Sequence, residues 1–154
     1  QSQNFDDALL DALNAFNRDD YETAYKLFLP LAEQGDMFAQ HFLALLHLEE
    51  GVNQDYKEAV KLFLLSAEQG NMFAQYGLGY MYYEGQGVPQ DYEEAVKWYR
   101  LSAEQGDAEA QCGLGEMYYG GEGVPQDYAE AIKLWKLAAE QGHEEAQYNL
   151  DNYA

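Results

Sequence analysis

The chain has 154 residues, 47% of them hydrophobic, and its 28 acidic against 8 basic residues leave a net charge of −20. Phosphate binding needs clustered Lys and Arg, so this composition argues against nucleic acid and against anionic membrane surfaces as partners. It fits a basic or amphipathic partner, or an excess of charge that only keeps a repeat protein in solution.

The first part of the chain predicts a helix pair. After a frayed lead-in at 1–4, apolar residues spaced by three and four predict a helix over 4–17. A tight turn at 17–19 leads into a second helix from Asp20 to about Gln34. Pro30 lies well inside that helix and predicts a kink, because proline removes a backbone donor.

The rest of the chain repeats this unit with a period of 35 or 36 residues. The period is marked by four tyrosines and four glycines: Tyr21, Tyr56, Tyr92, Tyr128, Gly35, Gly70, Gly106 and Gly142. Such a period indicates stacked supersecondary units. We therefore predict one repeat domain over 1–154, with units at about 4–35, 36–70, 71–106 and 107–142 and a terminal helix at 143–154.

Each later unit predicts two antiparallel helices, called here helix A and helix B. Helix A is expected over 37–48, 72–83, 108–119 and 144–153. Helix B is expected to begin at a capping box, in which Asp caps the helix and a Glu three residues later reaches back: Asp55/Glu58, Asp91/Glu94 and Asp127/Glu130. Asp20 is followed by Thr23, so the first copy keeps only the cap. The glycine that follows each helix B suits a left-handed residue.

The connections carry further predictions. The residue after the glycine that ends each helix B can cap the next helix A: Asp36, Asn71, Asp107 and His143. Histidine is a poorer cap than Asp or Asn. The loops from A to B are Gly-rich, with valines expected to pack on the core: Val52, Val88 and Val124. Glycine pairs inside helix A indicate close approach of helix B opposite a small residue: Gly77/Gly79 and Gly113/Gly115, facing Ala95 and Ala131.

These residues resemble a known family. The pattern Ala-x-x-x-Leu-Gly-x-x-Tyr, Gly-x-Gly-Val-x-x-Asp-Tyr and Ala-Glu-Gln-Gly over about 36–154 is similar to the Sel-1-like repeat, and the opening pair is closer to the related tetratricopeptide repeat. The resemblance implies an all-α fold, a right-handed α-solenoid of antiparallel helix pairs whose A helices line a concave groove. It also implies a role in holding protein complexes together. The disulfides of cysteine-rich members are impossible here, because Cys112 is the one cysteine.

The groove supplies the candidate partner-binding residues. Phe73, Tyr76, Tyr80 and Tyr83 share one helical face, and the resemblance turns that face into the groove. The same register in the neighbouring units selects further residues: Phe38, His41, Leu45, Leu48, Glu109, Cys112, Glu116 and Tyr119, followed by Glu145, Tyr148 and Asn152. Exposed aromatic clusters are typical of binding surfaces, although these side chains could instead pack between adjacent helices.

Signals for catalysis, metals or cofactors are weak. His41 and His47 are six residues apart and do not form the usual i, i+4 ligand pair. Cys112 has no neighbouring base in the sequence, which a thiolate nucleophile needs. The Gly-rich loops follow helices and lack Lys, unlike phosphate-binding loops. We predict no enzyme, no metal and no cofactor.

The sequence therefore predicts a scaffold that binds a partner's peptide or helix, with apolar and basic residues, in its groove. Self-association into a structural assembly is the alternative, and an enzyme built on helical repeats is a less favoured one. Because no apolar run reaches the ~18 residues of a membrane span, no membrane insertion is expected. The start without Met, and long-loop repeats that resemble bacterial ones, favour an exported bacterial protein, with a cytoplasmic location as the alternative.

Overall fold

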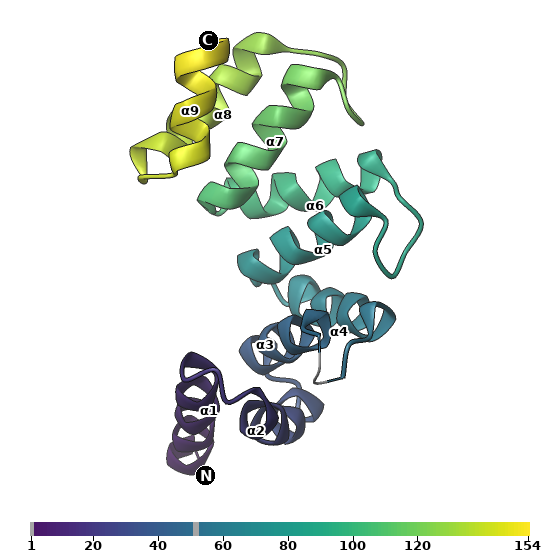
Figure 1. Ribbon diagram of the computed structural model, residues 1–154, viewed down its shortest axis with the longest axis vertical. Coiled ribbons are helices and arrows are strands. Elements are labelled where there is room, and N and C mark those ends of the chain that lie inside the picture. Colours follow the sequence, from purple (N-terminus) through teal and green to yellow (C-terminus); the bar gives the residue numbers. More distant parts are fainter. Residues whose placement is uncertain (1, 51–52) are drawn as a thin grey trace. The chain divides into compact units, whose positions relative to one another are not determined.

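The computed structural model describes residues 2–50 and 53–154, and these ranges hold nine α-helices and no strand. They fall into two compact units that meet in sequence at Asn71 and Met72. Unit 1 contains α1 (Ser2–Asn17), α2 (Tyr21–Glu33), α3 (Met37–Leu48) and α4 (Tyr56–Glu68). Unit 2 contains α5 (Met72–Glu84), α6 (Tyr92–Glu104), α7 (Ala108–Gly120), α8 (Tyr128–Glu140) and α9 (Glu144–Tyr153) (Figure 1). The predicted all-α class of paired helices is confirmed.

In unit 1, consecutive helices pack on one another around an aromatic centre. The Phe28 ring is fully buried and stacks on Phe42, with centroids 5.3 Å apart. Phe16 of α1 meets both rings edge-on. Three aromatic side chains from α1, α2 and α3 thus hold the first three helices together through apolar burial and edge-to-face contacts.

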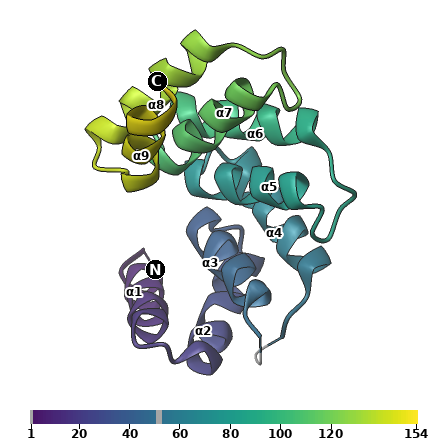
Figure 2. The same ribbon diagram turned by 45° about the horizontal axis from the view of Figure 1, so that its top comes forward.

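In unit 2, α5 to α9 also pack in chain order (Figures 1 and 2). One core cluster centres on Tyr99 and Leu114, and a second on Trp135 with Cys112. The loop between α5 and α6 and the loop between α7 and α8 project past the ends of the helices that they join (Figure 2). Val124 packs against the first cluster as predicted and Val88 is half-buried, while Val52 lies outside the described residues.

The helix ends agree with prediction with two corrections. The first helix begins at Ser2, so the predicted lead-in at 2–4 is already helical. The second correction concerns the capping boxes. Each Asp accepts from the amide three residues on, for example Glu94 N to Asp91 at 3.1 Å. The Glu does not complete the box, because the Asp91 amide already donates to Tyr82 O at 2.9 Å, and Glu94 accepts from the Trp98 indole instead.

Other local predictions are confirmed. The four glycines after helix B all have positive φ, between 89° and 99°. Asp36 and Asp107 cap α3 and α7. His143 also caps its helix, since its Nδ1 accepts from the Ala146 amide at 3.2 Å. Helices α5 and α7 run one residue further than expected, and α2 continues through Pro30 to Glu33.

A glutamine clamp ties each of the helices α4, α6 and α8 to the helix that precedes it. The Gln141 side chain donates to Gly106 O at 2.9 Å and to Gln111 Oε1 at 2.9 Å. Gln69 makes the equivalent bonds to Gly35 and Gln40 in unit 1. Since Gln40 and Gln111 are buried, these bonds satisfy polar groups that would otherwise be costly. Gln69, Gln105 and Gln141 are therefore structural residues.

The close approach predicted at the helix A glycines is confirmed at Gly79 and Gly115. A Cβ at Gly79 would lie 2.6 Å from Tyr99 Cδ1 and 3.3 Å from Ala95 O. At Gly115 it would lie 2.7 Å from Trp135 Cδ1 and 3.2 Å from Ala131 O. The alanines are at the contact, but the aromatic ring of helix B occupies the space.

In the described part of the chain, no helix combines the length and the apolarity needed to cross a membrane.

Gly79→Ala should lower the urea midpoint of unfolding, although alanine favours helices. The overpacking against Tyr99 should cost about 1–3 kcal/mol, more than the gain of about 1 kcal/mol in helix propensity. Gly120→Ala is the matched control, because its nearest neighbour would lie 3.6 Å away, and it should not lower the midpoint. Equal midpoints for both variants would contradict the close contact.

Candidate functional site

A cavity of about 210 Å³ opens among the helices of unit 2. We call it the tyrosine–glutamate pocket. Its lining comes from α5, α6, α7 and the start of α9: Tyr76, Tyr80, Tyr83, Glu84, Tyr99, Glu109, Cys112, Gly113, Glu116, His143 and Glu145. Aromatic rings and carboxylates thus dominate its wall.

The aromatic side of the pocket is built on α5 and α6. Tyr76 stacks on Tyr99 with centroids 5.4 Å apart, and Tyr80 lies 6.5 Å from Tyr76. Tyr99 is 4% exposed, whereas Tyr80 is 40% exposed and offers its ring to solvent. Burial, followed by neighbouring acidic groups, raises the pKa of Tyr76 and Tyr99 well above the usual range, and raises that of Tyr83 to about 12. These hydroxyls therefore stay protonated.

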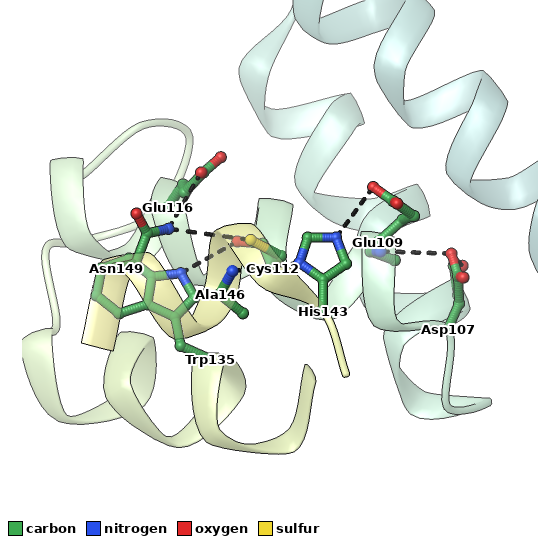
Figure 3. Close-up of polar contacts among 10 residues, drawn as sticks. Asp107, Glu109, Cys112, Glu116, Trp135, His143, Ala146 and Asn149 are labelled. Atoms are coloured by element: carbon green, nitrogen blue, oxygen red, sulfur yellow. Dashed lines mark hydrogen bonds and ion pairs between the residues drawn. The ribbon is translucent and has the colours of Figure 1, made fainter. Parts of the chain in front are cut away.

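The acidic side is built on α7 and α9 (Figure 3). The Asn149 amide donates to Glu116 Oε1 at 3.3 Å and points toward Cys112 Sγ at 3.9 Å. His143 Nε2 lies 3.2 Å from Glu109. Since His143 Nδ1 accepts from Ala146, the neutral ring carries its proton on Nε2 and donates it to Glu109.

Glu116 and Glu145 are close enough to influence each other. Desolvation raises the pKa of Glu116 to about 7, with a hydrogen bond and charge repulsion from Glu145 adding to the shift. Burial and the nearby carboxylates raise the pKa of the Cys112 thiol. The thiol is consequently held protonated, which is the opposite of what a nucleophilic cysteine requires.

The side-chain donor atoms of Cys112, Glu116 and Glu145 lie within 4.8 Å of one another, a spacing that could hold a metal ion. The fit is poor in two respects. The Asn149 N–H group is directed at two of the three donors, and the thiol is protonated. A metal ion would have to displace the amide and remove the proton, because thiolate is the ligating form.

Six of the twelve candidates from the sequence line the pocket: Tyr76, Tyr80, Tyr83, Glu109, Cys112 and Glu116. Phe73 is exposed on α5 without lining it, and Tyr119 instead packs against Tyr128, Trp135 and Tyr153. Glu145, selected by the same register, does line it. The sequence reasoning missed Tyr99, Glu84, Gly113 and His143, of which Tyr99 could have been suspected from the glycines opposite it.

The remaining four candidates, Phe38, His41, Leu45 and Leu48, lie on α3 in unit 1. Phe38 is 42% exposed, while His41 packs against Phe42 and Phe63, and its burial lowers its pKa to about 4. Unit 1 also has a cavity of about 610 Å³ lined from α2, α3 and α4, including Tyr25, His47 and Leu65. None of the four candidates lines that cavity.

Comparisons with known proteins agree with this architecture. The profile described as Sel1 repeat matches residues 17–36, 38–71, 73–107 and 108–143. A protective antigen of uropathogenic Escherichia coli with an SLR fold is similar to this chain at 42% identity over 82% of it, with a TM-score of 0.78. A Sel1 repeat protein from Oxalobacter formigenes is similar at 32% identity over 94%, with a TM-score of 0.88.

The chain spans 27% and 58% of the length of those two proteins. The Helicobacter pylori cysteine rich protein B shares the fold at 22% identity, with 83% of this chain and 92% of that one aligned and a TM-score of 0.67. A search of curated proteins gives no match. The similar structures thus establish the architecture of consecutive helix pairs found in solenoid repeats.

Cys112 should resist alkylation in the folded protein at pH 8. Its side chain is 2% exposed and the surrounding carboxylates suppress the thiolate. We expect iodoacetamide to label it far more slowly in buffer than in 8 M urea, as followed by intact mass. Labelling at the same rate in both conditions would rule out the buried, protonated thiol.

Glu116→Gln should stabilise the protein more at pH 8 than at pH 5. The raised pKa means that the folded state binds more protons than the unfolded state between about 4.5 and 7, so the contribution of Glu116 to stability is lost as the pH rises. The measurement is the urea midpoint at both pH values. Glu144→Gln, the same change on a residue of α9 outside the pocket lining, controls for net charge.

Proposed function

Because this chain belongs to the Sel1 repeat family, we propose that it is a protein-interaction scaffold whose tyrosine–glutamate pocket receives part of a peptide or helix from a partner. One observation carries the proposal: three tyrosines from one face of α5 meet acidic side chains from the next two repeats at one open cavity. The proposed role is binding without catalysis.

The chemistry of the pocket supports a protein ligand. Its 210 Å³ is smaller than the roughly 300–1,000 Å³ of typical small-molecule sites, so it suits one or two side chains of a longer ligand. Tyr80 offers an exposed aromatic surface of the kind that dominates binding energy at protein interfaces. The carboxylates favour a ligand with basic as well as apolar residues.

The proposal extends to the source of the protein. The similar structures come from Escherichia coli and Oxalobacter formigenes, which supports a bacterial origin. We propose export to the periplasm or the medium, supported by the description of the E. coli protein as a protective antigen. A cytoplasmic location is the alternative, and fractionation of the native cells with an antibody to the protein distinguishes them.

The test is a selection of displayed random 15-residue peptides against the whole protein, followed by affinity measurements on variants. Tyr80→Ala should weaken the selected peptides by tenfold or more, since hot-spot aromatics contribute about 2 kcal/mol or more. Phe73→Ala removes a comparably exposed ring from the same helix but outside the pocket, and should change affinity less than threefold.

Circular dichroism must show that both variants keep the helical content of the parent protein. Peptides that bind both variants as well as the parent would place the binding surface elsewhere. Peptides that lose affinity only for Phe73→Ala would move it to the N-terminal part of α5. Self-association, the alternative role, predicts instead that size-exclusion chromatography of the protein alone shows a concentration-dependent oligomer.

A further inference from the structure

Tyr99 is a largely buried residue whose hydroxyl finds no partner within the described part of the fold. Tyr99 is 4% exposed, yet within residues 2–50 and 53–154 its hydroxyl makes no hydrogen bond to another residue. Every fully enclosed polar side-chain atom in these ranges does have a partner. The Tyr99 hydroxyl is therefore not fully enclosed, and Tyr99 is part of the pocket lining. A hydroxyl that is accessible and has no partner within the fold is available to a ligand or to solvent.

The groups near that hydroxyl include carboxylates, which bind cations. The charged groups that act on Tyr99 include Glu116, and Glu116 lies beside Glu145 and Cys112 within a 4.8 Å cluster. Among the described residues, no Lys or Arg lines the pocket. His143 also lines the pocket; its Nε2 donates to Glu109, and its charge when protonated favours the ionised form of Glu116. Within the described ranges, the pocket thus gathers four glutamates without a Lys or Arg of its own.

We propose that the pocket is a subsite for one lysine side chain of the protein partner, with the ammonium group held by Glu116, Glu145 and the Tyr99 hydroxyl. This proposal rests on the proposed function and specifies what the pocket recognises. The lysine methylenes lie along the exposed Tyr80 ring, and the ammonium donates to the carboxylate oxygens of Glu116 and Glu145, which are exposed to solvent in the protein alone. A flexible apolar stem with a charged end matches a lining that combines aromatic rings with carboxylates.

The geometry favours an ammonium over the other cations. The acceptors are gathered in one compact cluster, which suits a point charge with three donors better than the planar fork of arginine. A metal ion would draw on the buried, protonated Cys112 thiol as a ligand, whereas an ammonium needs only the oxygen acceptors. In the unliganded protein, the neighbouring carboxylates and desolvation raise the pKa of Glu116. A bound ammonium replaces that proton as the neutralising charge.

The test titrates the isotope-labelled whole protein with acetyl-Gly-Leu-Lys-Leu-Gly-amide and follows the backbone amides of Cys112 and Glu145 by NMR. The matched peptide with norleucine in place of lysine keeps the stem and removes the charge. We expect at least tenfold weaker binding of the norleucine peptide, because charge-assisted hydrogen bonds are the strong ones. The arginine peptide should bind more weakly than the lysine peptide.

Two variants separate the site from a general effect of charge. Glu145→Gln should weaken the lysine peptide about tenfold, whereas Glu144→Gln, one residue earlier and outside the pocket, should leave it unchanged. Tyr99→Phe removes only the hydroxyl and keeps the ring between α5 and α7. It should weaken the lysine peptide severalfold without lowering the urea midpoint, since that hydroxyl has no partner in the fold.

The outcomes are distinct. Equal affinity of the lysine and norleucine peptides, or equal effects of Glu145→Gln and Glu144→Gln, would overturn the lysine subsite. Tighter binding of the arginine peptide, or saturable shifts of the same amides by Zn²⁺ alone at lower concentration, would overturn the choice of ammonium. If selected 15-residue peptides need Tyr80 but not lysine, the proposed function stands and the subsite fails. If the short lysine peptide binds while no longer peptide is selected, the subsite stands and the scaffold role fails.

Discussion

The structure of unit 2 depends on the space that two glycines leave for one aromatic ring. The Tyr99 ring of α6 lies between Gly79 of α5 and Gly113 of α7. A Cβ atom would come within 2.6 Å of the ring at Gly79 and 3.2 Å at Gly113. Any larger residue would push a helix away from α6, and packed interiors do not absorb such shifts cheaply. The same ring stacks on Tyr76 and lines the pocket, so one packing constraint sets both the helix spacing and part of the pocket wall.

Polar contacts between helices keep that spacing the same from repeat to repeat. Gln105 donates to Gln75 Oε1 at 2.8 Å, and Gln141 makes the equivalent bond to Gln111. Ser102 donates to Met72 O at 2.7 Å about one turn earlier in the same helix pair. Buried bonds of this kind specify one relative placement of two helices, because a shifted helix would leave the groups without partners. The pocket receives side chains from α5, α6, α7 and α9, so its shape depends on these contacts.

The pocket departs from the electrostatic pattern of the rest of the chain. Acidic residues elsewhere cap helices or pair with lysines on the surface, as Glu94 does with Lys97 at 3.5 Å. Glu116 and Glu145 instead face each other beside a buried thiol, at a cost that shows in the raised pKa of Glu116. Natural sequences accept such local conflicts mainly at functional sites. Both glutamates remain exposed, so a basic group of a partner can reach them.

The sequence by itself determined the helices, their Asp caps, the glycine ends and the family, because these features depend on neighbours within one or two turns or on the repeat period. It also selected the face of α5 that holds Tyr76, Tyr80 and Tyr83. Only the tertiary structure decided which residues of different repeats meet. The turn before α9 brings His143 and Glu145 onto α7, while Tyr119, in the same register as Tyr83, packs against α8 and α9 instead. The capping box of Glu94 failed for a related reason: the Tyr82 carbonyl of α5, brought close by the loop, already binds the Asp91 amide that the box requires. Register specifies a face of a helix, but the side chains of the neighbouring helices decide what each residue on that face can reach.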